Sequence, residues 1–327
     1  MPHLLAIESS DSLLSLALVP LDAADTSQSP ADMLEENLLP STGVFFTSSS
    51  RQPTAERLLP AVDFLLRDAG ISADDLAGVA INAGPGSFTG LRVSAIVAKT
   101  IAERQSIPLV PVPGLLARAL AHVGGRLQPG WPVVVMADAR RGEVFGAVYD
   151  LPEDALHVAD ADDADASELR RAMGGHKSAG HLHETAGGCC GGGGHHTEHH
   201  DPHEDHQHDH HDEDSPSLPW RTLLKPLNSP AAGFLLEVKG RLGGRPCVLC
   251  CSQQVLAMLG QAASGIPRTW EYMPGEPPAQ VTAREVAALG RVMLRAGATA
   301  DPVAFEPRYI READAKLPAV PQPPMPQ

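Results

Sequence analysis

Apolar residues in this chain fall into short runs that alternate with longer stretches of helical spacing. The short runs, bounded by Ser, Asp, Gly and Pro, predict strands at 4–8, 13–19, 43–50, 78–81, 133–137, 144–148 and 247–251. Spacings of three and four residues predict helices at 54–69, 91–103, 115–122 and 282–295. Strands that alternate with helices in this way indicate an α/β fold.

Two of the predicted helices carry distinctive faces. In helix 54–69 the apolar positions form one wide stripe, and in helix 91–103 small side chains gather on one side. One interpretation is that these faces pack against the protein's own sheet, and the other is that they contact a second subunit. The residues concerned are Leu58, Val62, Leu65, Leu91, Ser94, Ala95, Ala98 and Ala102.

A glycine-rich loop connects the predicted strand 78–81 to the helix at 91. It contains three glycines, a proline and two hydroxyl side chains, so the backbone can turn sharply with little bulk in the way. Amides at the start of a helix favour an anion or a close partner surface. The residues with this potential are Gly84, Gly86, Ser87, Thr89, Gly90 and Arg92, although the string matches neither Gly-x-Gly-x-x-Gly nor the P-loop pattern.

The net charge of −15 is concentrated in one segment. Residues 151–214 hold 16 acidic and three basic side chains, and the rest of the chain is close to neutral. Strong nucleic-acid binding by this chain alone is therefore not expected, because affinity for phosphate comes mainly from Lys and Arg. Neither a leader pattern nor an apolar run of spanning length occurs, so we expect a cytoplasmic protein without a membrane partner.

Twelve of the 15 histidines lie between residues 176 and 211. Glycine and charge dominate this tract, so we expect a disordered insertion in a second lobe, with adventitious metal binding. A metal-storage or sensing role is the alternative. A specific zinc site is not predicted, because the many interchangeable ligands do not define four fixed positions. The densest ligands are His195, His196, His199, His200 and His203.

Two further groups of reactive side chains lie outside the tract. Cys247, Cys250 and Cys251 occur together without zinc-finger or thioredoxin context, which favours buried free thiols on a strand. The charged residues between Asp138 and Glu143 either position a ligand or form ion pairs at a strand end. Arg92 either contacts an anion held by the glycine loop or caps a carbonyl.

Four strings together resemble the TsaB (YeaZ) family: residues 4–10 (Leu-Leu-Ala-Ile-Glu-Ser-Ser), the helix start 56–60, the glycine loop 84–92, and 138–144. Pro307-Arg308-Tyr309-Ile310-Arg311 adds a weaker match. The resemblance covers residues 3–150 closely and about 280–312 loosely. It implies a two-lobed actin-like (ASKHA, RNase H-like) fold. In actin-like kinases the turn equivalent to 9–12 holds nucleotide phosphates, whereas the alternative here is a simple polar turn.

The resemblance also implies a function. Family members are non-catalytic partners of TsaD, which transfers a threonylcarbamoyl group to the adenosine next to the anticodon in ANN-reading tRNAs. The helices at 54 and 91 would then form the docking surface. TsaE would join the assembly, tRNA would be bound only through the complex, and the chain could pair with itself when TsaD is absent. No cofactor is implied.

This sequence departs from the family at one informative place. The helix that carries a His-x-x-x-His metal pair in TsaD, and one histidine in most TsaB proteins, has Ala55 and Leu59 at the two ligand positions. Neither side chain can bind a metal. A protease role is not supported either, because Gly-x-Ser-x-Gly and His-Glu-x-x-His are both missing from the sequence.

We therefore expect a docking lobe at 1–112 and a second lobe at 113–300. The low-complexity insertion at about 152–218 interrupts the second lobe, and a C-terminal segment with a Pro-rich tail follows at 301–327. Two alternatives to the scaffold stay open. One is a residual nucleotide-binding phosphotransferase or hydrolase that uses Ser9, Ser10 and the glycine loop, and the other is a metal-handling protein.

Overall fold

A computed structural model describes residues 1–11, 13–21, 39–49, 52–123, 130–150, 218–274 and 280–310. Residues 1–160 and 216–327 form one compact unit, to which all of these ranges belong. The histidine tract and most of the Pro-rich tail therefore lie outside the described residues. The same holds for the insertion expected at 152–218, apart from its last residue.

The first sheet has the order β3-β2-β1-β4-β5. Its strands are β1 (His3–Glu8), β2 (Leu14–Pro20), β3 (Val44–Ser48), β4 (Leu76–Asn82) and β5 (Leu109–Val112). The first three strands are antiparallel neighbours, whereas β4 and β5 run parallel to β1. The expected strands at 4–8, 13–19, 43–50 and 78–81 are confirmed. β5 is not among the predicted strands, because it is short and contains Pro111, yet proline is compatible with an edge strand.

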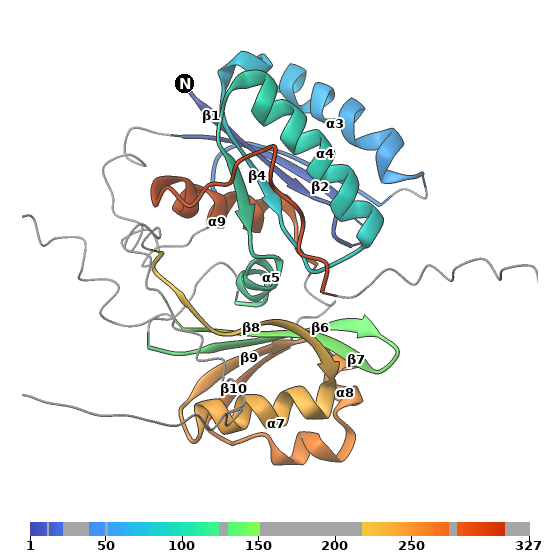
Figure 1. The fold of residues 1–327 in the computed structure, drawn as a ribbon, viewed down its shortest axis with the longest axis vertical. Helices are drawn as coiled ribbons and strands as arrows, with labels where there is room; N and C mark the ends of the chain where they lie inside the picture. The colour runs from blue at the N-terminus through green and yellow to red at the C-terminus, as the bar shows by residue number, and fades with distance from the viewer. Residues whose placement is uncertain are drawn as a thin grey trace, which may run out of the picture. The chain divides into compact units, whose positions relative to one another are not determined.

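Helices cover both faces of this sheet (Figure 1). The helices α3 (Thr54–Asp68) and α4 (Phe88–Gln105) lie on one face, and α9 (Ala283–Arg295) lies on the other. Because the sheet is buried on both sides, its central strands are apolar at successive positions rather than alternating. In β1, for example, Leu4 faces the core with α9 while Leu5 faces the core with α3 and α4.

The second sheet repeats the topology of the first. Its order is β10-β9-β6-β7-β8, with antiparallel β6-β7-β8 and parallel β6-β9-β10. The strands are β6 (Val133–Arg140), β7 (Glu143–Asp150), β8 (Arg221–Pro230), β9 (Cys247–Cys251) and β10 (Trp270–Pro274). The helix α7 (Ala231–Leu242) follows the third strand, as α3 does in the first sheet. The helix α8 (Gln253–Met258) follows the fourth, as α4 does.

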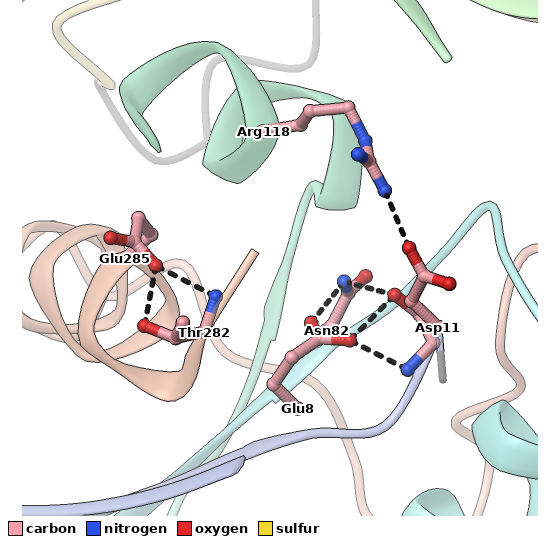
Figure 2. Close-up of polar contacts among 7 residues, drawn as sticks. Glu8, Asp11, Asn82, Arg118, Thr282 and Glu285 are labelled. Carbon is pink, nitrogen blue, oxygen red and sulfur yellow. Dashed lines mark hydrogen bonds and ion pairs between the residues drawn. The ribbon is translucent and has the colours of Figure 1, made fainter. Parts of the chain in front are cut away.

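One core contains side chains from both sheets, from α9, and from α5 (Gly114–His122). The helix α9 packs on β1, β2, β4 and β5 of the first sheet, although it follows the second sheet along the chain. Sequence order alone does not reveal such a return of the chain. A capping box fixes the start of α9, where a Glu285 carboxylate oxygen accepts hydrogen bonds from the Thr282 amide and hydroxyl, both at 2.7 Å (Figure 2).

The segment 151–220 leaves and returns at one end of a hairpin, because Asp150 of β7 pairs with Arg221 of β8. Asp150 is buried and accepts two hydrogen bonds from Arg245, at 2.8 and 3.3 Å. A bidentate ion pair therefore holds the base of the insertion. Two short 3₁₀ helices, η1 (Ala73–Asp75) and η4 (Gly260–Gly265), complete the described elements.

Candidate functional site

The glycine loop lies directly on the turn that follows β1. The Ser87 amide donates a 2.6 Å hydrogen bond to the Ser10 carbonyl. A Cβ added at Gly86 would lie 2.5 Å from the Cβ of Ser10, and one at Gly90 would lie 1.9 Å from the Ser9 carbonyl oxygen. Glycine is thus required at both positions by the close approach of two backbones, a reason independent of any bound anion.

The same loop is connected to the C-terminal segment. Gly84 has a φ of +99°, and a Cβ there would lie 2.8 Å from the Arg308 carbonyl oxygen. The Arg308 amide donates a 2.7 Å hydrogen bond to the Ala83 carbonyl. The weak match at residues 307–311 therefore includes a segment that packs on the strongest motif in the chain.

Three buried polar side chains connect the ends of β1 and β4 beneath this loop. Glu8 accepts hydrogen bonds from the Ser10 amide and hydroxyl, both at 2.6 Å, and from the Asn82 side-chain amide. The Asn82 side-chain amide also donates to the Ser10 hydroxyl at 3.0 Å, and the Asn82 carbonyl oxygen accepts from the Gly84 amide at 2.8 Å. Figure 2 shows Glu8 and Asn82 in contact, with Asp11 beside them.

Burial raises the pKa of Glu8, and the hydrogen bonds from Ser10 and Asn82 and the charge of Arg118 oppose this rise only in part. The contribution of Asn82 was not predicted from the sequence. A signal was available, since Glu8 and Asn82 each end an apolar strand. Because β1 and β4 are parallel neighbours, their carboxyl ends meet at the same edge.

Both serines proposed as reactive groups are engaged within the fold. The Ser9 hydroxyl donates to the Gly90 carbonyl at 2.9 Å, and the Ser10 hydroxyl donates to Glu8. Both residues are buried. The Ser9 hydroxyl therefore holds the glycine loop on the β1–β2 turn, and the Ser10 hydroxyl belongs to the network with Glu8 and Asn82.

An open pocket of about 420 Å³ lies next to this network. Its wall contains Ser10 and Asp11 from the β1–β2 turn, and Asp138 and Arg140 from the end of β6. Arg118 of α5 also lines it and forms a 3.5 Å ion pair with Asp11 (Figure 2). A second pocket of about 260 Å³ shares both aspartates and both arginines, and reaches Ser252 and Gln254.

The charged residues at 138–143 include side chains that line the pocket and one that bonds to a neighbouring strand. Asp138 and Arg140 line the pocket, whereas Glu143 accepts a 2.8 Å hydrogen bond from Asn228 on β8. Arg140 and Arg141 both have left-handed backbones, with φ of +66° and +59°. Non-glycine residues in this region are uncommon and mark a constrained turn.

The structure revises the residues expected at a partner surface. All of them are buried within the protein, where they pack α3 and α4 on the first sheet: Leu58, Val62, Leu65, Leu91, Ser94, Ala95, Ala98 and Ala102. The sequence pattern identifies the apolar stripe but does not show whether the sheet or a partner covers it. The large apolar side chains that these helices expose are instead Leu59 (58% exposed), Phe64 (56%), Ile96 (62%) and Phe88 (38%).

The remaining residues of the loop have different surroundings. The Arg92 guanidinium lies over the Phe88 ring, 4.7 Å from its centroid, and the Phe88 and Tyr309 rings are 4.9 Å apart. Thr89 is exposed, and the Ser87 hydroxyl caps α4 by accepting from the Gly90 amide at 3.3 Å. Arg92 is thus part of an exposed aromatic cluster on the first turns of α4.

Within the described ranges, His, Cys, Asp and Glu side chains do not form a group that could hold a metal ion. The expected ligands His195, His196, His199, His200 and His203 lie outside those ranges. Cys247, Cys250 and Cys251 are buried thiols on β9 that form no disulfide within the described residues, as predicted. Burial raises the pKa of Cys247 to about 12, which disfavours the reactive thiolate. Among the helices described, none is long and apolar enough to cross a membrane.

Comparisons with known proteins identify relatives of part of the chain. A family profile described as "TsaD: tRNA N6-adenosine threonylcarbamoyltransferase" matches residues 36–185. The tRNA threonylcarbamoyladenosine biosynthesis protein TsaB of Bacillus subtilis is 38% identical over 95 residues, which are 28% of this chain and 39% of that protein. The Escherichia coli protein of the same name is 34% identical over 101 residues, 31% of this chain and 43% of the relative. The chain thus matches about two fifths of each of these relatives.

A solved structure has a similar fold over most of the chain. It is described as a protein with similarity to peptidase YEAZ from Pseudomonas aeruginosa. The TM-score is 0.55 at 17% identity, with 95% of this chain and 100% of the other covered. This likeness supports the mixed α/β architecture with two sheets.

Proposed function

From its place in the TsaB (YeaZ) family, which the curated relatives and the similar structure support, we propose that this chain is a non-catalytic subunit in tRNA threonylcarbamoyladenosine synthesis. It would bind TsaD and activate it for transfer to the adenosine next to the anticodon of ANN-reading tRNAs. We interpret the repeated sheet topology as the two halves of an actin-like fold.

The observation that carries the docking part of this proposal is the outer face of α3 and α4. Leu59, Phe64 and Ile96 each expose more than half of their surface on two neighbouring helices. Large apolar side chains at the centre of an interface, surrounded by polar ones, are the usual anchors of protein association. The polar surroundings are present here, since Asp63 and Arg67 form an exposed ion pair at 3.0 Å on the same helix.

The proposal that the chain is not itself the transferase has support from its residue types. Ala55 and Leu59 stand on α3 where TsaD has its two metal-binding histidines, and neither side chain offers a ligand atom. Ser9 and Ser10 are buried and hydrogen-bonded. Threonylcarbamoyl transfer would therefore belong to TsaD, with TsaE as a further member of the assembly, tRNA bound only by the complex, and a cytoplasmic location.

The docking model is tested by size-exclusion chromatography with light scattering, using this chain mixed with TsaD from the same source. Ile96→Glu and Phe64→Glu should remove the complex, because each places a charge in an apolar interface. Leu236→Glu is the matched control, since Leu236 is 71% exposed on α7 of the second sheet. A complex that survives both α3 and α4 substitutions contradicts the model. The isolated chain is measured in the same way. If it forms a homodimer and the same two substitutions abolish that dimer, the outer face of α3 and α4 binds both TsaD and a second copy of the chain.

A second candidate function rests on the density of histidines at 176–211, where 12 of 15 are found. Such a tract can take up nickel, zinc or copper from solution. Removal of the tract separates the two functions. The scaffold proposal predicts that tRNA modification persists in the deletion strain, whereas the metal-handling proposal predicts that growth at raised metal concentration fails.

A further inference from the structure

We propose that the C-terminal segment 299–310 and the glycine loop form one corner of the surface that binds TsaD. This inference rests on the proposed docking function, in which only the outer faces of α3 and α4 take part. It adds a group of contact residues, Phe88, Arg92, Val303 and Tyr309, and it gives the glycine loop the task of positioning one of them.

Polar contacts hold segment 299–310 beside α4, where Figure 1 shows it in red. The Lys99 ammonium donates hydrogen bonds to the carbonyls of Val303 and Phe305, both at 2.9 Å. The Phe305 side chain packs on the core that α3 and α4 share with the first sheet. At the other end, the Ala300 amide donates to a β5 carbonyl at 2.8 Å. The segment is therefore a fixed part of the surface around α4.

The glycine loop sets the position of the last residues of this segment. A Cβ at Gly84 would lie 2.8 Å from the Arg308 carbonyl oxygen, so only glycine allows the two backbones to approach this closely. The Arg308 amide donates to the Ala83 carbonyl at 2.7 Å. Because Tyr309 is the next residue, these contacts hold its ring beside Phe88, with the ring centroids 4.9 Å apart. The loop thus positions an aromatic side chain on the surface.

Exposed apolar side chains from three segments gather on this part of the protein. Phe88, Arg92 and Ile96 recur every four residues and therefore share one face of α4. Val303 lies next to that face, since its carbonyl bonds to Lys99, which is three residues from Ile96. Such a gathering of exposed apolar groups marks an interaction surface. Six of the nine large apolar side chains that the described residues expose belong to it: Leu59, Phe64, Phe88, Ile96, Val303 and Tyr309.

Positive charge at this corner indicates the chemistry of the partner. The Arg92 guanidinium lies over the Phe88 ring, 4.7 Å from its centroid, and both Arg92 and Arg308 are exposed. Glu306 is the one acidic residue between 302 and 310, and the first three turns of α4 contain none, so the corner has a net positive charge. Aromatic and arginine side chains are the usual anchors of protein interfaces. We therefore expect a carboxylate of TsaD to pair with Arg92.

A protein partner accounts for these side chains better than RNA does. Ile96 and Val303 offer no hydrogen bond to a base or a phosphate, and the net charge of −15 opposes RNA binding by the chain. TsaD suits the surface because the family model described as TsaD matches residues 36–185, a range that includes α3 and α4. A partner with an equivalent pair of helices would present a similar apolar face.

The dissociation constant of the complex with TsaD from the same source tests the proposal, measured by biolayer interferometry on the full chain. Tyr309→Ser, Val303→Glu and Arg92→Glu should each weaken binding about tenfold or more, as the loss of an interface anchor does. Arg92→Lys should recover part of the affinity, because it keeps the charge. Phe45→Ser is the matched control and should have little effect. Phe45 is as exposed as Tyr309, at 38%, and also contacts an arginine, but it lies on β3.

A double variant tests the role of the glycine loop. Gly84→Ala should weaken TsaD binding, because the added Cβ displaces the segment that carries Tyr309. If the loop acts by positioning Tyr309, Gly84→Ala combined with Tyr309→Ser should bind no more weakly than Tyr309→Ser alone. Circular dichroism at the assay temperature checks that each variant is folded, and Tyr309→Ser tests the same contact if Gly84→Ala does not fold. Additive losses would overturn the positioning role.

The outcomes separate this inference from the docking proposal. A parent chain that forms no complex with TsaD would overturn both. If Ile96→Glu abolishes the complex while Tyr309→Ser and Val303→Glu bind TsaD as the parent does, the docking proposal stands and this inference is wrong. If the isolated chain binds tRNA, and Tyr309→Ser weakens that binding but leaves TsaD affinity unchanged, the corner belongs to RNA and the inference is also overturned.

Discussion

The helices α4 and α8 hold equivalent places in the two sheets, since each follows the fourth strand, yet they differ in nearly every other respect. α4 has 18 residues and begins after a glycine-rich loop, whereas α8 has six and follows β9 after the single residue Ser252. The glycine loop packs on the turn after β1 over a buried Glu8–Asn82 contact. The same topology thus has a long, glycine-rich connection between β4 and α4 in the first sheet and a single-residue connection between β9 and α8 in the second.

This difference indicates that most of the candidate functional features lie beside the first sheet, at the glycine loop and the helices next to it. The glycine loop and the pocket adjoin the carboxyl ends of β1 and β4. The exposed apolar residues lie on α4, which follows β4, and on its neighbour α3. The second sheet contributes the pocket residues Asp138 and Arg140 and the base of the insertion. Four predictions, in order of decreasing effect, test how far this contrast holds.

The largest effect should come from adding one methyl group to the glycine loop. Gly90→Ala would place a Cβ 1.9 Å from the Ser9 carbonyl oxygen, and a backbone atom cannot move aside as a flexible side chain can. We expect a loss of about 3 kcal/mol in the free energy of unfolding, the upper end of overpacking effects. The control is Gly240→Ala in α7, where nothing lies within 4 Å and a gain of about 0.5–1 kcal/mol is expected. Urea denaturation measures the change in the free energy of unfolding for both variants. Equal changes would contradict the contrast between the two sheets.

Removal of Asn82 should have the next largest effect. Asn82→Ala leaves one oxygen of Glu8 and the Gly84 amide without their side-chain partner in a buried site. An unsatisfied buried polar group costs about 1–3 kcal/mol, so we expect a loss of about 2 kcal/mol. The thermal midpoint, followed by circular dichroism, measures this change. A variant as stable as the parent would show that the network does not hold the loop.

Stability should depend on pH through Glu8. Because burial raises the pKa of this acid above its ordinary 4.5, the folded chain holds the proton more tightly than the unfolded chain. The free energy of unfolding should therefore fall as pH rises from about 4.5 through the raised pKa, by about 1.4 kcal/mol for each unit of the rise. Glu8→Gln should lack this component. Urea titrations from pH 4 to 9 measure the free energy of unfolding of the parent chain and of Glu8→Gln. The same pH dependence in both proteins would contradict the prediction.

The smallest effect concerns the two helix caps. The Ser87 hydroxyl accepts from the Gly90 amide at 3.3 Å, and the Ser252 hydroxyl accepts from the Val255 amide at 3.2 Å. Loss of an N-cap costs about 1 kcal/mol in either helix. Ser87→Ala and Ser252→Ala should thus destabilise the chain equally by chemical denaturation, while only Ser87→Ala should reduce TsaD binding. A reduction by both would place the docking surface elsewhere.

The amino-acid sequence by itself determined the elements whose signals are local. The apolar runs identified β1, β2, β3, β4, β6, β7 and β9, and the three- and four-residue spacing identified α3, α4, α5 and α9, because period and turn residues are properties of a short window. It also located the glycine loop and the charged cluster at 138–143. β5 was not predicted because proline weakens a strand pattern, and only the position of β5 at the edge of the sheet accounts for Pro111.

Only the tertiary structure decided which faces are covered and which polar groups meet. Ala98 and Ile96 are neighbours on one helix, yet the sheet buries the first and leaves the second 62% exposed. Glu8 and Asn82 are 74 residues apart and come into contact because β1 and β4 are parallel neighbours. Arg140 lines a pocket with Asp11 for a different reason: the turns that follow β1 and β6, one from each sheet, lie at the same pocket. Such contacts depend on chain crossings that no local pattern encodes.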